Sequence, residues 1–252
     1  MIMNLFKKLT IVTLSVLAFG CSGDIPGAGR EYRVSQVIDG DTIELDTGEA
    51  VRYLGIDTPE TRRREGEKWV YDPDAYAEEA KEFNRGMVEG KSVRLEFDLQ
   101  RIDKYKRLLA YCFVGADFVN ARLLEEGYAL LYTSPPNVKY ADILVKKQEE
   151  ARRNNKGLWA EIPLISPQDA LKYLNKIVTV EGKVSSVYQS PKVVILNFGR
   201  SGFKADFSVF MAQGVSLTGY KGRVVRITGK VKEYKDDFEI IVRHPSDIET
   251  VE

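Results

Sequence analysis

Two short acidic turns in the first quarter of the chain hold the residues best suited to chemistry. Asp41 lies in Val37-Ile38-Asp39-Gly40-Asp41-Thr42-Ile43, and Asp57 lies in Ile56-Asp57-Thr58-Pro59-Glu60. Each carboxylate closes an apolar run, where burial without a partner would be costly. A cation is the natural partner, and a hard metal ion would take these oxygens together with the carbonyl of Thr58. The pattern therefore predicts a metal site formed by Asp41, Asp57 and Thr58.

Two arginines and one more carboxylate would complete a hydrolytic site. Arg52 and Arg107 lie at predicted strands and, if the register holds, point to one face, where their planar guanidinium groups can hold a phosphate through paired hydrogen bonds. Glu60 supplies a base close to the metal. A metal, two arginines and a carboxylate are the groups needed for phosphodiester hydrolysis. Each stretch alone is also typical of an ordinary turn or a surface ion pair, so the hypothesis rests on their combination.

Together with Asp103-Lys104-Tyr105-Lys106-Arg107, these stretches resemble the staphylococcal nuclease (thermonuclease) family from Tyr32 to Trp159. Glu126-Gly127-Tyr128-Ala129 and Leu158-Trp159 support the likeness. The resemblance implies an OB-type five-stranded β-barrel with packed helices, Ca²⁺ as the cofactor, and DNA and RNA substrates cleaved to leave 3′-phosphates. It implies that Asp41, Asp57 and the Thr58 carbonyl are calcium ligands, with Asp39 behind them, and that Glu60 positions or activates water. It implies that Arg52 and Arg107 clamp the phosphate in the transition state. It also implies that Lys104 and Tyr105 contact a terminal phosphate or neighbouring nucleotide and that Tyr132 stacks on a base.

Three features depart from the family pattern. Lys106 stands where glycine is usual, and the segment around Tyr132 is one residue shorter. The polar stretch from Arg62 to Asp72 is longer than expected, and its arginines and aromatic residues suit either contact with nucleic acid or a solvated loop.

The composition excludes several other classes of enzyme. The chain has 37 Lys and Arg against 37 Asp and Glu, so net charge does not predict non-specific binding to a polyanion. His244 is the one histidine, and the two cysteines are Cys21 and Cys112. A zinc site of histidine and cysteine or an iron–sulfur centre lacks ligands. The 44% hydrophobic and 29% charged content is typical of a globular protein.

The N-terminal segment has the pattern of an export signal of the lipoprotein type. Lys7 and Lys8 precede an apolar run from Leu9 to Phe19, which is too short to span a bilayer. Small residues before Cys21 resemble a lipobox, which predicts a lipid on Cys21 and display in the cell envelope outside the cytoplasm. Ordinary signal cleavage with secretion is the alternative. After lipidation of Cys21, Cys112 would lack an intramolecular disulfide partner.

The periodicity of the rest predicts a mainly β fold with helices (α+β). Strand patterns cover Tyr32–Leu54 (two strands around Asp46–Glu49), Ser92–Asp98 and Arg107–Val114, and helical patterns cover Tyr76–Val88, Asn120–Glu126 and Tyr140–Asn154. The second half predicts a helix over Pro167–Leu174 and five strands over Val178–Val187, Val193–Phe198, Ala205–Met211, Arg223–Lys232 and Phe238–Arg243. Five short strands with glycines at the bends suggest a second, small OB-like β-barrel.

These patterns predict five segments and one function. The segments are a signal peptide (1–20), a tether (21–30), a nuclease-like domain (31–160), a linker (161–166) and an OB-fold-like domain (167–252). The function is calcium-dependent hydrolysis of DNA and RNA by in-line attack of water. The alternative is a non-catalytic nucleic-acid-binding or envelope scaffold protein, and no protein partner is implied.

Overall fold

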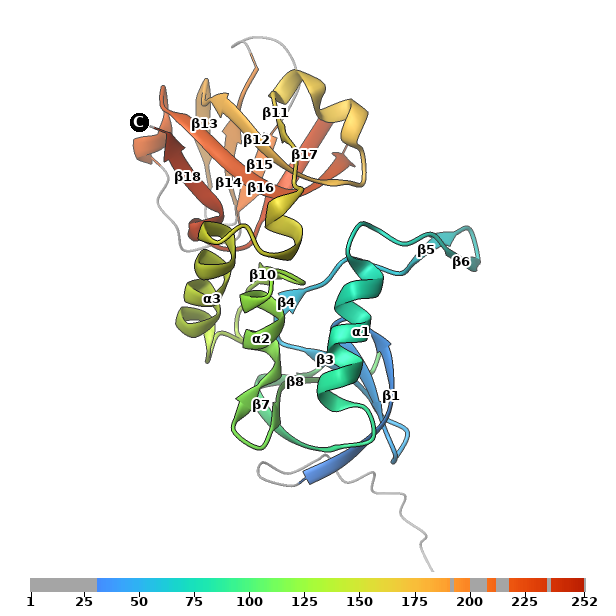
Figure 1. Ribbon diagram of the computed structural model, residues 1–252. Helices are drawn as coiled ribbons and strands as arrows, with labels where there is room; N and C mark the ends of the chain where they lie inside the picture. The colour runs from blue at the N-terminus through green and yellow to red at the C-terminus, as the bar shows by residue number, and fades with distance from the viewer. Residues whose placement is uncertain (1–30, 191–192, 200–207, 212–217, 235–236, 252) are drawn as a thin grey trace, which may run out of the picture.

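The computed structural model describes residues 31–190, 193–199, 208–211, 218–234 and 237–251, which are mostly β-strand with a few helices (Figure 1). Buried apolar side chains form two separate clusters. One draws on residues from Tyr32 to Leu144, and the other on residues from Ile165 to Ile248. We call residues 31–160 the N-terminal half and residues 164–251 the C-terminal half. In Figure 1 the C-terminal half lies above the N-terminal half.

The N-terminal half is built on a sheet whose strand pairing closes on itself. Its strands follow the order β3-β2-β1-β7-β8-β9, and β3 also pairs with β8 in parallel. Five strands therefore form a continuous ring around the first cluster, which accounts for the alternating buried residues of β1. The strands are β1 (Glu31–Asp39), β2 (Thr42–Leu45), β3 (Ala50–Tyr53), β7 (Ser92–Ile102), β8 (Leu108–Val114) and β9 (Asp117–Phe118).

Three helices pack against this ring and against one another. Helix α1 (Ala77–Val88) buries residues three or four positions apart, which is the spacing of one helical face. Helix α2 (Val119–Glu125) ends just before Gly127, whose φ of 74° favours glycine. Helix α3 (Ala141–Arg153) is followed by the short 3₁₀ turn η1 (Gly157–Ala160). The three predicted helices are confirmed to within about one residue at each end.

Two further pairs of strands lie outside the ring. Strand β4 (Gly55–Asp57) pairs with β10 (Leu130–Tyr132). Strands β5 (Arg62–Glu65) and β6 (Lys68–Tyr71) form a hairpin that projects beyond the end of α1 (Figure 1).

The described residues of the C-terminal half form one sheet of eight strands. The order is β11-β12-β16-β17-β15-β14-β13, with β18 on the free side of β16. The long central strand β16 connects most of the sheet, because it pairs with three others. The elements are β11 (Leu164–Ile165), η2 (Pro167–Tyr173), β12 (Ile177–Lys183), β13 (Ser186–Gln189), β14 (Val194–Asn197), β15 (Ser208–Met211), η3 (Thr218–Tyr220), β16 (Val224–Tyr234), β17 (Asp237–Val242), η4 (Pro245–Asp247) and β18 (Ile248–Val251).

Several predicted boundaries were wrong. Tyr32–Leu54 holds three strands rather than two, because the chain also turns at Gly40 and Asp41. Val178–Val187 divides into β12 and β13, and Pro167–Tyr173 is a 3₁₀ helix. The first three residues of the predicted strand Ala205–Met211 lie outside the described residues.

Two further observations concern single features. Cys112 is fully buried, and burial raises the pKa of its thiol to about 12, as expected of an inert core cysteine. Within the described ranges, which begin at residue 31, no helix is both long and apolar enough to cross a membrane.

Candidate active site

The two acidic turns meet at one end of the strand ring, with Arg52 between them. Its guanidinium lies 2.5 Å from a carboxylate oxygen of Asp41 and 2.5 Å from one of Asp57. Arg52 is opposite Thr42 in the β2–β3 pairing, and Asp57 is the last residue of β4. The sequence analysis predicted all three residues as part of the site, and the structure brings them together.

Close packing of the turns fixes the position of Asp41. A Cβ on Gly40 would lie 2.7 Å from the hydroxyl oxygen of Thr58, so only glycine allows this approach. The backbone N–H of Thr58 donates to Asp41 Oδ2 at 2.9 Å, and the hydroxyl of Thr42 donates to Oδ1 at 3.0 Å. Asp41 is therefore held by hydrogen bonds and an ion pair while almost fully buried.

Glu60 and Asp39 add two more acidic groups. Burial, and after it the charges of Asp41, Asp39 and Asp57, raises the pKa of Glu60 to about 8. Burial and the charge of Asp41 raise the pKa of Asp39, whose carboxyl shares a hydrogen bond with Glu60. Four carboxyl groups thus gather near the guanidinium of Arg52, and burial together with the charge of Asp41 raises the pKa of Asp39, Asp57 and Glu60.

This donor set fits a hard divalent cation in chemistry and charge. The side chains offer only oxygen, and their mutual repulsion would be relieved by added positive charge. Among the described residues, however, no three Asp, Glu, His or Cys side chains already converge as a cage for a metal ion. The positive group between Asp41 and Asp57 is instead the Arg52 guanidinium.

Arg107 lies near this end of the ring, on the turn that leads into β8. Asp103 accepts hydrogen bonds from the backbone N–H of Arg107 at 2.9 Å and from its Nε at 2.8 Å. Because Arg52 is opposite Leu109 in the β3–β8 pairing, Arg107 is two residues away, or about 7 Å along the strand. The departure at Lys106 has a visible consequence, since its φ of 67° is a conformation that favours glycine.

The two residues predicted to contact a neighbouring nucleotide sit on the same turn. Tyr105 is exposed, with the Lys104 ammonium 4.9 Å and the Arg107 guanidinium 5.5 Å from the centre of its ring. Tyr132 is opposite Gly55 in the β4–β10 pairing, which places it beside the acidic turns. The Arg243 guanidinium lies 4.8 Å from the centre of the Tyr132 ring. The stacking of Tyr132 on a base stays a prediction.

Sequence reasoning missed the contribution of the C-terminal half. Lys230 Nζ lies 2.7 Å from a carboxylate oxygen of Asp74, and the backbone N–H of Asp74 donates to the carbonyl of Glu60 at 2.9 Å. Burial raises the pKa of Asp57, while the charges of Arg52, Lys230 and Lys232 act to lower it. Arg243, Lys230 and Lys232 follow the acidic turns by more than 150 residues, so no local pattern could have indicated them.

Asn84 of α1 is a second missed residue. It is fully buried, donates to the carbonyl of Asp39 at 3.4 Å and accepts from the hydroxyl of Tyr53 at 3.1 Å. A polar residue on the buried stripe of a helix is the signal that could have revealed it. Asn84 thus connects α1 to the turn that carries Asp39.

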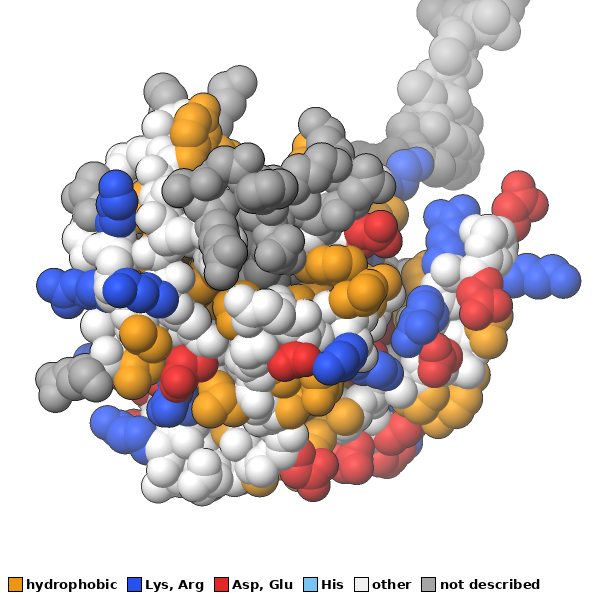
Figure 2. Space-filling model, turned by 90° about the horizontal axis from the view of Figure 1, so that it is seen from above, with side chains coloured by type: hydrophobic (Ala, Val, Ile, Leu, Met, Phe, Trp, Pro, Cys, Tyr) orange, Lys and Arg blue, Asp and Glu red, His pale blue; other side chains and the backbone are white. Residues whose placement is uncertain are grey.

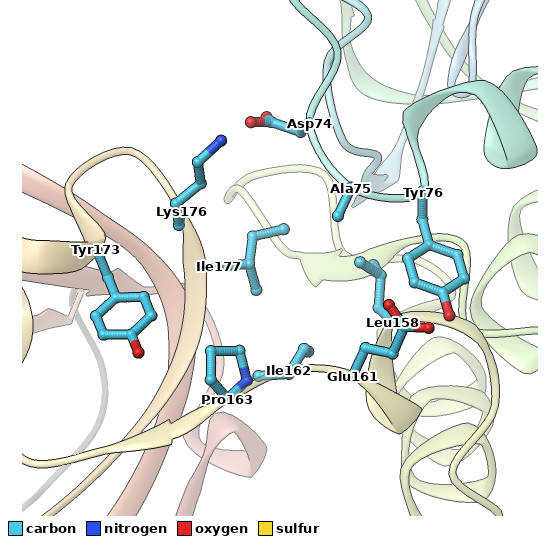
Figure 3. A pocket seen from close by; sticks show the side chains of 10 residues that line it. All are labelled: Asp74, Ala75, Tyr76, Leu158, Glu161, Ile162, Pro163, Tyr173, Lys176 and Ile177. Atoms are coloured by element: carbon cyan, nitrogen blue, oxygen red, sulfur yellow. The ribbon is translucent and has the colours of Figure 1, made fainter.

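A cavity of about 230 Å³ lies in the seam between the two halves (Figure 3). Asp74 and Lys176 extend toward each other at one end of it, and Tyr76 lies beside Glu161 at the other. None of the four clustered carboxyl residues lines it, so this cavity is separate from the acidic site. Its lining residues are Asp74, Ala75, Tyr76, Leu158, Glu161, Ile162, Pro163, Tyr173, Lys176 and Ile177.

Comparison with known proteins identifies the class of fold and enzyme. The family model described as staphylococcal nuclease homologue matches residues 50–161. The chain is 34% identical over 159 residues to the thermonuclease of Staphylococcus hyicus, covering 60% of this chain and 91% of that protein. It is 37% identical over 134 residues to the thermonuclease of Staphylococcus intermedius, covering 52% and 77%. It is 38% identical over 136 residues to an SPbeta prophage-derived endonuclease of Bacillus subtilis, covering 52% and 44%.

These matches define a nuclease whose matched region is an OB-type fold. The chain belongs to the family of staphylococcal nuclease homologues. The resemblance inferred from the acidic and arginine stretches is confirmed for this region, and so is a mostly β fold with a few helices.

Proposed function

We propose that this protein is a calcium-dependent endonuclease that hydrolyses the phosphodiester bonds of DNA and RNA. The observation that carries the proposal is the array of Asp41, Arg52 and Asp57, with Glu60 beside it. Its relatives include proteins named thermonuclease and endonuclease. Asp41, Asp57 and the carbonyl of Thr58 would hold the metal.

The residues of the chain divide the chemistry between them. When bound, Ca²⁺ would polarise the phosphate and offset the charge of the carboxylates. Glu60 orients the attacking water and accepts its proton. Arg52 and Arg107 donate to the phosphate oxygens as negative charge develops on them. Asp103 orients Arg107, because it already holds the Nε side of the guanidinium and leaves the other edge for the substrate.

A digestion assay tests this proposal. The full chain should cleave fluorescent single-stranded DNA with Ca²⁺ and stop when a chelator is added, and Zn²⁺ should not replace Ca²⁺ because the site offers no soft ligand. Asp41→Ala should abolish calcium-dependent cleavage. Binding without cleavage would favour a non-catalytic nucleic-acid-binding or scaffold protein. Near-normal cleavage by Asp41→Ala would overturn the metal assignment.

The finer fold and the domain boundaries belong to the same proposal. We infer that the closed ring of five strands is a barrel and that residues 167–252 form an OB-like domain after a linker at 161–166. The separate apolar clusters of the two halves support this division. Expression of residues 31–160 alone tests it, since an independent domain should unfold cooperatively.

The location of the protein is also part of the proposal. The segment 1–20 would be a signal peptide, and Cys21 would carry a lipid that holds the enzyme on the outer side of a membrane, with 21–30 as a tether. Two or three acyl chains hold a protein firmly, whereas one gives only marginal binding. Cys21→Ser should release active enzyme from membranes or stall its processing. A mature N-terminus beyond Cys21 without lipid, found by mass spectrometry, would refute the anchor.

A further inference from the structure

The β5–β6 hairpin presents two chemically different faces. The register places Arg62 opposite Tyr71 and Arg64 opposite Trp69. Because directly opposed residues share a face and side chains alternate along a strand, these four residues lie on one face. We call them the aromatic–arginine face. The other face carries Arg63, Glu65, Lys68 and Val70.

The hairpin is a defined structure rather than a solvated loop. Gly66 takes the first central position of a two-residue turn with φ of 61°, as in a type II′ hairpin. At its base, the backbone N–H of Asp72 donates to the carbonyl of Thr61 at 3.3 Å. The hydroxyl of Tyr71 is hydrogen-bonded to Glu78 at the start of α1. The ribbon is therefore fixed in register and tied to the helix beside it.

Charge is neutralised on one face and left free on the other. Arg63 lies 2.8 Å from the carboxylate of Asp72, and Glu65 is opposite Lys68. Within the part of the chain that the structure describes, neither Arg62 nor Arg64 forms an ion pair. The side chains of Trp69 and Tyr71 are 66% and 64% exposed. Arg64 Nε donates to the carbonyl of Gly66 at 3.0 Å, which leaves the other nitrogens of that guanidinium for a ligand. Two guanidinium groups that no carboxylate neutralises and two exposed aromatic residues thus share one surface.

This combination suits a single-stranded polynucleotide. Aromatic rings stack on unpaired bases, and arginines bind the phosphates between them. Each opposed pair, Arg62 with Tyr71 and Arg64 with Trp69, forms one rung of the hairpin and offers one guanidinium and one ring. The two rungs are about 7 Å apart, which matches two successive nucleotides. The hairpin begins two residues after Glu60, so a strand bound at the acidic turns reaches the nearer rung first.

We propose that the aromatic–arginine face of the β5–β6 hairpin is a binding site for single-stranded DNA or RNA that extends the substrate site of the enzyme. The proposal rests on the proposed nuclease function. The surface seen in Figure 2 carries intermixed acidic and basic side chains, so a broad basic surface on that side does not provide this contact. The contact is confined to the hairpin. Its aromatic residues can stack only on unpaired bases, and a duplex does not expose such bases on its outside.

The two faces provide a matched experiment on the full chain. Binding of a fluorescein-labelled 12-nucleotide oligo(dT) is followed by anisotropy in chelator, so that cleavage does not intervene. Trp69→Ala with Tyr71→Ala should weaken binding at least tenfold. Arg62→Gln with Arg64→Gln should weaken it and reduce the slope of log K against log salt by about 1.4, as expected for two phosphate contacts.

The control variant is Lys68→Gln with Val70→Ala on the opposite face, which should bind within about twofold of the wild type. All substituted side chains are exposed or half-exposed, and thermal melting checks that each variant folds. With Ca²⁺, the ratio of kcat/KM for the 12-nucleotide strand to that for a dinucleotide should fall at least tenfold in the aromatic double variant.

The outcomes separate this proposal from the proposed function. Equal binding by all variants, with cleavage intact in the wild type, would overturn the hairpin site alone. Absence of wild-type cleavage, with binding lost only in the variants of the aromatic–arginine face, would overturn the nuclease proposal and keep the binding site. Loss of binding to anionic phosphatidylglycerol vesicles, with oligo(dT) binding unchanged, would show that the face contacts lipid and would overturn the proposal.

Discussion

Asp247 should make the stability of the protein fall as the pH rises from about 4 to about 6.5. Its carboxyl is buried in the seam, where it accepts a hydrogen bond from Gln148 Nε2 at 2.7 Å. Burial raises its pKa from 3.8 to about 6, against the opposing effects of Gln148 and the charge of Arg152. Asp247→Asn keeps the size and an acceptor oxygen but removes the ionisation.

The direction and size follow from proton linkage. Below pH 3.8 the carboxyl is protonated in both the folded and the unfolded chain, and its full contribution to stability is present. As the pH rises through about 6, the unfolded chain loses the proton first, so that contribution is lost. A shift of about 2 pKa units corresponds to about 3 kcal/mol. Because the new amide N–H₂ also needs a partner, which costs about 1 kcal/mol, Asp247→Asn should stabilise the fold by about 2 kcal/mol at pH 8 and not at pH 4.

Urea unfolding of the wild type and the variant between pH 4 and pH 8 measures this difference. Asp117→Asn, which makes the same change of charge at an exposed residue of β9, is the control and should leave the pH profile of the wild type unchanged. Parallel pH profiles for the wild type and Asp247→Asn would show that Asp247 ionises as freely as in the unfolded chain, and the reasoning would be refuted.

Three more substitutions test individual contacts. Arg52→Gln should lower kcat at least about 100-fold, because a donor to the phosphate is lost. It should lower the unfolding free energy by about 3–5 kcal/mol, because the buried Asp41 loses its cation. A decrease of kcat of only a few-fold in steady-state assays would exclude a role of Arg52 in the transition state. Arg107→Lys keeps the charge but loses the planar fork, so kcat should fall by about 10²–10³ while the melting temperature stays unchanged, and near-normal turnover would point to Lys106 instead. Gly127→Ala should lower the unfolding free energy measured in urea by about 2–5 kcal/mol, because a Cβ would lie 2.1 Å from the carbonyl oxygen of Lys156 at a φ of 74°. The control Gly90→Ala, with a φ of 72° but open space around it, should lower it by only about 1–2 kcal/mol. Equal losses would contradict the steric argument.

The sequence could predict the local parts of the site because each part is carried by a short stretch. Asp41, Arg52 and Asp57 lie within 17 residues; the β2–β3 pairing places Arg52 opposite Thr42, next to Asp41, and Asp57 follows the end of β3 by four residues. The helices were predictable because their buried residues recur at helical spacing. The number of strands in Tyr32–Leu54 was wrong, because the acidic turn at Gly40 and Asp41 was not counted as a break between β1 and β2.

The remaining parts depend on contacts between distant residues. The β5–β6 hairpin was read as a polar stretch, because exposed strands carry no apolar alternation and only Gly66 indicates the turn. Arg243 meets Tyr132, and Lys230 meets Asp74, only after the two halves have packed together. Charge and aromatic content indicate what such residues could bind, but not which partner they face.

The contacts across the seam make the C-terminal half part of the support for the acidic turns. The side-chain oxygen of Gln148 accepts from the backbone N–H of Leu131 at 2.7 Å, while its amide nitrogen donates to Asp247. Leu131 belongs to β10, which pairs with the strand that ends in Asp57. On the other side, Lys230 holds Asp74, whose backbone is bonded to Glu60. These hydrogen bonds connect the seam to Asp57 and to Glu60. A substitution in the seam should therefore shift both acidic residues through the backbone, without contacting the substrate.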